Sequence, residues 1–242
     1  GRIADILFVE DLRTFEIAKV IADGQLVAEN GSLLVTYPSP KYPANFYGTM
    51  HLDKPITEDD IYITVPETAT EACVLLMYLE PYSLRTRREL TLPVEDGRIQ
   101  PDPEQDALYI SVTDRHSGKG KTAAAFVGGF GLKRGAFATS LSPDDDNVIC
   151  IGASVDDMVV ATNHLFEIDG GQCVVVDGEV IADLQLPLCG FMTDKPAEEV
   201  AEQERVLRQK LFDLGVNIPK PFFSVLFLSI TAIPEFAVTD QG

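Results

Sequence analysis

The sequence predicts an α+β fold with mixed β-sheets and two or more packing helices. Short apolar, β-rich runs separated by Pro, Gly or Asp fill the first half of the chain, and two amphipathic helical patterns lie in the second half. The runs do not alternate regularly with helices, as they would in a doubly wound parallel sheet. With 242 residues and 45% apolar content, the chain is long enough for a full core in one large or two modest domains.

Residues 1–40 predict a small β segment. Asp23-Gly24, between VIA and QLVAE, is typical of a type I′ hairpin turn, because both residues tolerate positive φ angles. The stretch YPSPKYPAN, from Tyr37 to Asn45, carries three prolines and predicts an extended connector. We therefore expect a domain boundary near residue 40, with a first domain of residues 1–40 and a second of residues 41–242.

The second domain opens with candidate strands. Four runs have strand character: IYITV (61–65), ACVLLMYL (72–79), RRELTLPV (87–94) and ALYISVTD (107–114). They are followed by the glycine-rich apolar tract TAAAFVGGFGLKRGAFATSL (122–141). Glycines in such a tract allow strands to pack closely or bring the backbone near a ligand.

Two helices are expected later in the chain. The first covers 155–168, with Ser154 as its N-cap, and the hairpin QCVVVDGEVIADLQL follows it. The second runs from about 196 to 214, capped by Thr193 or Asp194 and ended by Gly215. Each has one apolar stripe, so both are predicted to pack on the core.

Charge and cysteine content narrow the classes of partner and compartment. The formal net charge of -19 repels a phosphate backbone, so nucleic acid is not an expected partner. The longest apolar stretch, PFFSVLFLSITAIPEF, is too short to span a bilayer, so no membrane association is expected. The four cysteines are widely spaced, and three lie in apolar runs, which favours buried thiols and a cytoplasmic location.

The short motifs do not predict a cofactor or metal site in this chain. In SGKGKT, Arg115 occupies the place where a phosphate-binding loop needs its first glycine. In GGFGLKRG, Arg134 stands where a dinucleotide-binding loop needs its third. The only histidines, His51, His116 and His164, are far apart and form no metal-binding motif.

Two polar stretches remain as candidates for a functional site. One is Asp114-Arg115-His116, which ends a predicted strand at a glycine loop. The other is SLSPDDDN, in which an extended backbone would place Asp144 and Asp146 on the same side. Two carboxylates held close would bind a cation or shift a pKa, whereas a hydrated turn is the simpler alternative.

The order of these motifs resembles the C-terminal region of bacterial adenine deaminases of the amidohydrolase superfamily. The resemblance runs from about residue 106 to 240, through DRHSGKGKT, the glycine-rich tract, SLSPDDDN, LPLCGFMTD and IPEFAVTD. The opening GRIADILFVEDL and KVIADGQLVAENG resemble the strands that complete the small β-domain of an amidohydrolase after its barrel. The resemblance implies that the catalytic barrel is absent from this chain, and the opening glycine favours an excised part over a natural subunit.

The resemblance also implies an activity for the whole protein. Adenine deaminases convert adenine and water to hypoxanthine and ammonia at a manganese, iron or zinc centre, which the missing barrel domain would hold. The expected partners are that barrel, a small purine substrate and further copies of the protein in a homo-oligomer. Two alternatives are a non-catalytic assembly or binding module and a related amidohydrolase that deaminates another purine or heterocycle.

Individual residues are carried over only where they match the family pattern. The family has His-Asp-Ser-His-Asn where this chain has PDDDN, so Asp144 and Asn147 match, while Pro143 and Asp146 replace histidines. Arg115 and His116 match an E-R-H motif, with Asp114 in place of the Glu. The resemblance therefore gives five candidates for the edge of the active site: Arg115, His116, Asp144, Asp146 and Asn147.

Overall fold

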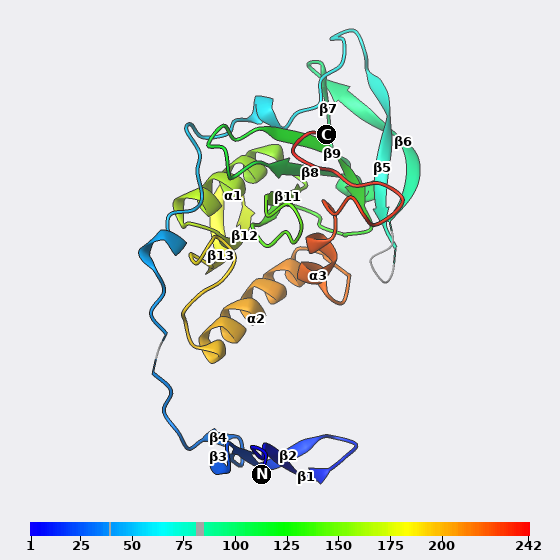
Figure 1. The fold of residues 1–242 in the computed structure, drawn as a ribbon. Coiled ribbons are helices and arrows are strands. Elements are labelled where there is room, and N and C mark those ends of the chain that lie inside the picture. The colour runs from blue at the N-terminus through cyan, green and yellow to red at the C-terminus, as the bar shows by residue number, and fades with distance from the viewer. Residues whose placement is uncertain (39, 81–84) are drawn as a thin grey trace. The chain divides into compact units, whose positions relative to one another are not determined.

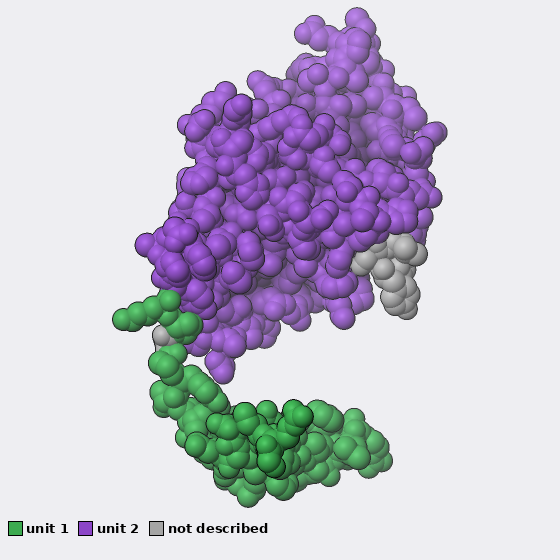
Figure 2. Space-filling view, viewed as in Figure 1, with its two compact units in different colours: residues 1–41 green, residues 42–242 purple. Residues whose placement is uncertain are grey.

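A computed structural model describes residues 1–38, 40–80 and 85–242, and Ser39 of the predicted connector lies outside these ranges. The chain forms two compact units, Gly1–Lys41 and Tyr42–Gly242, coloured separately in Figure 2.

The first unit is a four-stranded antiparallel sheet in the order β1-β2-β3-β4. Its strands are β1 (Ile6–Asp11), β2 (Glu16–Ala22), β3 (Gln25–Glu29) and β4 (Ser32–Leu33). The predicted turn joins β2 to β3, with φ of 49° at Asp23 and 74° at Gly24. None of the described residues in this unit is buried, so the sheet has no core of its own.

The second unit is built on a nine-stranded mixed sheet in the order β13-β12-β10-β11-β8-β9-β5-β6-β7. All neighbouring strands are antiparallel except β5 and β9, which are parallel. The strands are β5 (Glu71–Leu79), β6 (Arg85–Glu95), β7 (Arg98–Ile99), β8 (Leu108–Thr113), β9 (Thr122–Gly128), β10 (Ala136–Thr139), β11 (Val148–Gly152), β12 (Gly171–Val176) and β13 (Glu179–Gln185).

Helices cover both faces of this sheet and give three layers (Figure 1). Helix α1 (Val155–Glu167) packs on one face, where Met158 and Leu165 are fully buried. Helices α2 (Ala197–Asp213) and α3 (Pro221–Leu226) pack on the other, through residues such as Leu207 and Leu211. Three short 3-10 turns, Ala44–Phe46, Glu58–Asp60 and Pro103–Gln105, lie in the connections. The predicted α+β class is confirmed.

Two predictions about strand and helix boundaries are wrong. Residues 61–65 do not form a strand of the sheet: they follow a 3-10 turn that Thr57 and Asp60 cap reciprocally, and Thr64 makes one isolated bridge to Arg98. The cap of α2 is neither Thr193 nor Asp194 but Pro196, which supplies no side-chain acceptor. The Ser154 cap of α1 is confirmed, because its side chain accepts from the amide of Asp157.

The cysteines divide between core and surface. Cys150 and Cys173 are fully buried, and burial raises the pKa of the Cys150 thiol to about 12. Cys73 is exposed on β5 and Cys189 is half-buried, so the expectation of buried thiols is wrong for Cys73. Among the helices of the described residues, none combines the length and apolar character that crossing a membrane requires.

Candidate functional site

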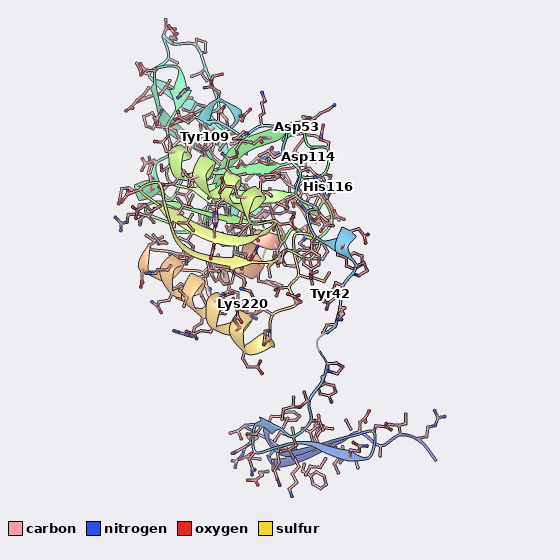
Figure 3. All side chains as sticks on the ribbon, turned by 90° about the vertical axis from the view of Figure 1, so that its left-hand side faces the viewer. Tyr42, Asp53, Tyr109, Asp114, His116 and Lys220 are labelled. Carbon is pink, nitrogen blue, oxygen red and sulfur yellow. The ribbon has the colours of Figure 1, made fainter. Side chains whose placement is uncertain are left out.

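Segments that are far apart in the sequence meet beside the loop between β8 and β9. Leu52 forms a parallel bridge with Gly118, and the amide of Asp53 donates to the carbonyl of Gly118 at 2.7 Å. Figure 3 shows Asp53, Asp114 and His116 in one region of the surface. The amide of His51 donates to the carbonyl of Arg115 at 3.1 Å. Folding therefore brings the backbones around His51 and His116 together despite their separation in sequence.

Arg115 lies at the centre of this region and is only 2% exposed. Its Nε donates to the main-chain carbonyl of Asp146, and its Nη1 donates to the carbonyl of Cys189 at 2.9 Å. Burial lowers the pKa of the guanidinium, and the charge of Asp146 acts in the opposite direction. The side chain joins the acidic loop to the turn at Cys189, which makes it a structural link in this conformation.

The neighbouring residues Asp114 and His116 have different surroundings. The Asp114 carboxylate accepts from the hydroxyl of Ser117 and from the amide of His116 at 2.9 Å, which closes a tight turn. Burial alone would raise the pKa of Asp114, but these donors outweigh it and lower the pKa. His116 is exposed, and its Nε2 lies 3.2 Å from the main-chain oxygen of Asp145.

The acidic loop is a tight turn and not the extended segment that was expected. Asp144 and Asp146 have φ of 99° and 52°, in the left-handed region that Asp tolerates better than most residues. The prediction of an extended backbone here is therefore wrong. Asp144 points to solvent, whereas Asp145 turns inward and accepts from the hydroxyls of Ser142 and Ser229, the second at 3.2 Å.

Asn147 ends the loop inside the protein, with 4% exposure. Its amide nitrogen donates to Asp240 at 3.3 Å, and the side chain of the next residue, Gln241, accepts from Lys121. The C-terminal segment is thus bound to both polar loops. The structure therefore brings the five sequence-predicted residues into one region, with Arg115 and Asn147 buried, Asp146 half-buried, and His116 and Asp144 exposed.

Three residues of this region were not predicted from the sequence: Asp145, Ser229 and Asp240. Asp145 lies between two other aspartates, and no sequence feature identifies it as the one whose side chain points inward. Ser229 and Asp240 lie in an apolar C-terminal stretch, and only the return of that stretch across the sheet places them beside the loop.

The glycine-rich tract binds a carboxylate of the same chain. The carboxylate of Asp106 accepts from the amides of Gly129 and Gly131, at 2.7 and 2.8 Å. Both glycines have positive φ, and a Cβ at Gly129 would collide with the carbonyl of Leu79. Of the two readings of this tract, close packing is therefore the one that the contacts support.

The polar side chains around Arg115 are held by hydrogen bonds to one another and to the backbone. Within residues 1–38, 40–80 and 85–242, no group of three or more His, Cys, Asp or Glu side chains is placed to hold a metal ion. His164 pairs with Asp183 at 2.9 Å, away from the acidic loop. The residues around Arg115 therefore do not fit a transition-metal centre with histidine ligands.

A separate open groove of about 550 Å³ lies between α2, α3 and β13. Its lining is mostly apolar, including Leu184, Leu186, Val200 and Phe222. The charged residues at the groove are the paired Glu204 and Arg208, together with Lys220. None of the five candidate residues lines it.

Comparison with known proteins identifies the family. Residues 83–242 match the family described as adenine deaminase C-terminal domain. The whole chain aligns with adenine deaminase 4 of Rhizobium meliloti (42% identical over 244 residues) and adenine deaminase 1 of Desulfotalea psychrophila (40% over 242 residues). It also aligns with the adenine deaminase of Moorella thermoacetica (37% over 243 residues).

These alignments cover 100% of this chain but only 40 to 41% of each relative. The chain therefore spans about two fifths of the length of the curated relatives it matches. The resemblance predicted from the sequence is confirmed over most of the chain. This chain belongs to the adenine deaminase C-terminal domain family.

Proposed function

We propose that this chain is the C-terminal part of a metal-dependent adenine deaminase that converts adenine and water to hypoxanthine and ammonia. The observation that carries the proposal is the alignment of the whole chain with proteins named adenine deaminase, over 40% of their length. The remaining length of such a protein would contain an amidohydrolase barrel that holds manganese, iron or zinc. This chain's own residues support that barrel and border the substrate site.

The decisive experiment compares the complete polypeptide with this chain alone. Both are incubated with adenine after loading with Mn²⁺, Fe²⁺ or Zn²⁺, and ammonia release is measured. We expect turnover from the complete polypeptide only. Metal-dependent turnover by the 242-residue chain alone would refute this division of labour.

Residues 1–40 are proposed to be the end of the amidohydrolase β-domain. The register places Leu7, Val20, Ala28 and Leu33 across one face of the first unit, and Ile6, Ile21 and Leu26 across the other. Antiparallel sheets commonly bury one face and expose the other, whereas here both faces carry apolar side chains. Such a sheet needs a further layer of protein to bury it, and residues 41–242 then form the separate C-terminal domain.

The five candidate residues are proposed to act at the active-site edge by binding substrate or ordering water. His116 and Asp144 are the best tests because both are exposed. Replacing Asp144 by Asn in the complete enzyme should lower kcat/KM for adenine about tenfold if the loop borders the substrate. Asp96→Asn, in an exposed turn before Gly97, is the matched control and should leave kcat/KM unchanged. Equal activity of both variants would support a non-catalytic assembly module.

A second candidate is deamination of a different purine or heterocycle. Pro143 and Asp146 stand where the family pattern has histidines, and neither can donate as an imidazole does. A panel of adenine, other aminopurines and aminopyrimidines, assayed by ammonia release, separates this candidate from adenine deamination.

The proposed enzyme acts in the cytoplasm as a homo-oligomer. The buried thiols of Cys150 and Cys173 are compatible with a reducing compartment. Sedimentation of the complete protein tests the oligomer, and a monomer at working concentration would contradict it.

A further inference from the structure

Arg85, the first residue of β6, carries a buried charge that binds a single stretch of backbone. The side chain is 2% exposed. Its Nη1 donates to the carbonyls of Phe227 and Leu228, at 3.1 and 3.0 Å. Its Nη2 donates to the carbonyl of Ile230 at 3.0 Å and to that of Ile233. Across the part of the chain that the structure describes, no carboxylate pairs with Arg85, so these carbonyls compensate for the desolvation of its guanidinium.

These contacts fix the segment 227–233, which follows α3. In Figure 1 the chain after α3 passes β5 and ends near β8 and β9. The amide of Glu235 also donates to the carbonyl of Arg85 at 3.2 Å, which ties the far end of the segment to β6. A lysine has one ammonium group and cannot reproduce the planar, forked donor geometry that meets several carbonyls at once.

Ser229 lies inside this segment and faces the acidic loop. It is 1% exposed, and its Oγ lies 2.8 Å from Oγ of Ser142. The same hydroxyl donates to Oδ1 of Asp145 at 3.2 Å. Asp145 in turn offers its main-chain oxygen to His116. Arg85 and the acidic loop are thus joined by one short series of contacts through Ser229.

We propose that Arg85 is a positioning residue for the acidic loop and that the segment 227–233 is the strap through which it acts. Arg85 fixes the strap, Ser229 on the strap holds Asp145 inward, and the inward Asp145 keeps Asp144 exposed. Without the strap, Asp145 loses a hydroxyl donor and the turn at Pro143–Asn147 opens to other conformations.

The test is hydrogen exchange of the loop amides in the 242-residue chain. The amide of Asp146 donates to the carbonyl of Ser142 at 2.8 Å, so its exchange rate reports on the closed turn. We expect Ser229→Ala and Arg85→Met to raise the exchange rate over residues 142–147 about tenfold each, while the β8 amides stay protected. Arg87→Met is the matched control, because Arg87 is exposed and lies over the ring of Phe236 at 5.8 Å. It should leave the loop unchanged.

Two results would overturn the proposal. One is faster exchange in 227–236 of the Arg85→Met protein with unchanged exchange in 142–147. The other is unchanged loop exchange in the Ser229→Ala protein, a small substitution that leaves all Arg85 contacts in place. Should Arg85→Met fail to fold, Arg85→Lys takes its place: it keeps the charge without the forked donors, so it should also raise exchange in 142–147, and the same criteria apply to it.

Discussion

Replacement of Asp106 by Ala removes both acceptors of the amides of Gly129 and Gly131. A hydrogen bond to a charged group contributes about 1.5 to 3 kcal/mol to stability. Asp106 is half-buried, which lets water replace part of each bond. Taking the lower figure for both bonds, we expect the loss of the hydrogen bonds to lower the free energy of unfolding by about 3 kcal/mol. Asp106→Asn keeps one acceptor oxygen and should lose about half as much.

The backbone of Asp106 requires a control, because its φ of 53° is in the left-handed region. Alanine there costs roughly 1 kcal/mol irrespective of the lost hydrogen bonds. Asp96 has nearly the same backbone, with φ of 50°, and is exposed in the turn before Gly97. Asp96→Ala therefore measures the backbone cost, and the difference between the two alanine variants gives the contribution of the carboxylate.

The assay is urea unfolding of the 242-residue chain, followed by circular dichroism with all variants at one pH. Equal losses for Asp106→Ala and Asp96→Ala would refute the reasoning. The glycine-rich loop would then be held by its own packing, and its amides would be available to an external anion.

Three further outcomes follow from the structure. Burial raises the pKa of Tyr109 to about 12, so the stabilisation from its neutral phenol is present below pH 10 and lost as the pH rises toward 12. In an ultraviolet titration the Tyr109 phenol should ionise late, and Tyr109→Phe should remove its contribution to the late absorbance change. The pKa of Asp114 is lowered below 3.8, so the stability gap between wild type and Asp114→Asn should shrink as the pH falls through that range in urea titrations. Leu207→Ala should cost about 2 to 5 kcal/mol in urea unfolding and the exposed Val206→Ala under about 0.5, and similar losses would argue against the assigned packing face of α2.

Features governed by neighbouring residues were predictable from the sequence. Asp23-Gly24 forms its hairpin and Ser154 caps α1, because the deciding contacts lie within a few residues. The run 61–65 has the apolar pattern of a strand, yet the reciprocal cap of Thr57 and Asp60 starts a 3-10 turn just before it. A strand also needs a partner along its length, and among the described residues the run 61–65 has only the single bridge from Thr64 to Arg98.

The composition of the candidate region was more predictable than its geometry. Arg115 and the acidic loop were singled out from motif order, and the structure brings them together. The extended backbone of the acidic loop was predicted wrongly, because Asp is among the residues that enter the left-handed region most easily. The donors that turn Asp145 inward include Ser229, whose position depends on the long-range return of the C-terminal segment.

Burial divides the candidate residues into two kinds with different physical roles. Arg115 donates to the carbonyl of Cys189 and Asn147 donates to Asp240, so moving either side chain toward a substrate breaks internal hydrogen bonds. Asp144 is exposed and can meet an adjoining surface directly, and the exposed His116 would give up one contact, with the main-chain oxygen of Asp145. If this region borders the substrate site, the exposed His116 and Asp144 therefore make the contacts with substrate. The buried Arg115 and Asn147 hold the loop in place, and many substitutions at these two positions would destabilise the protein.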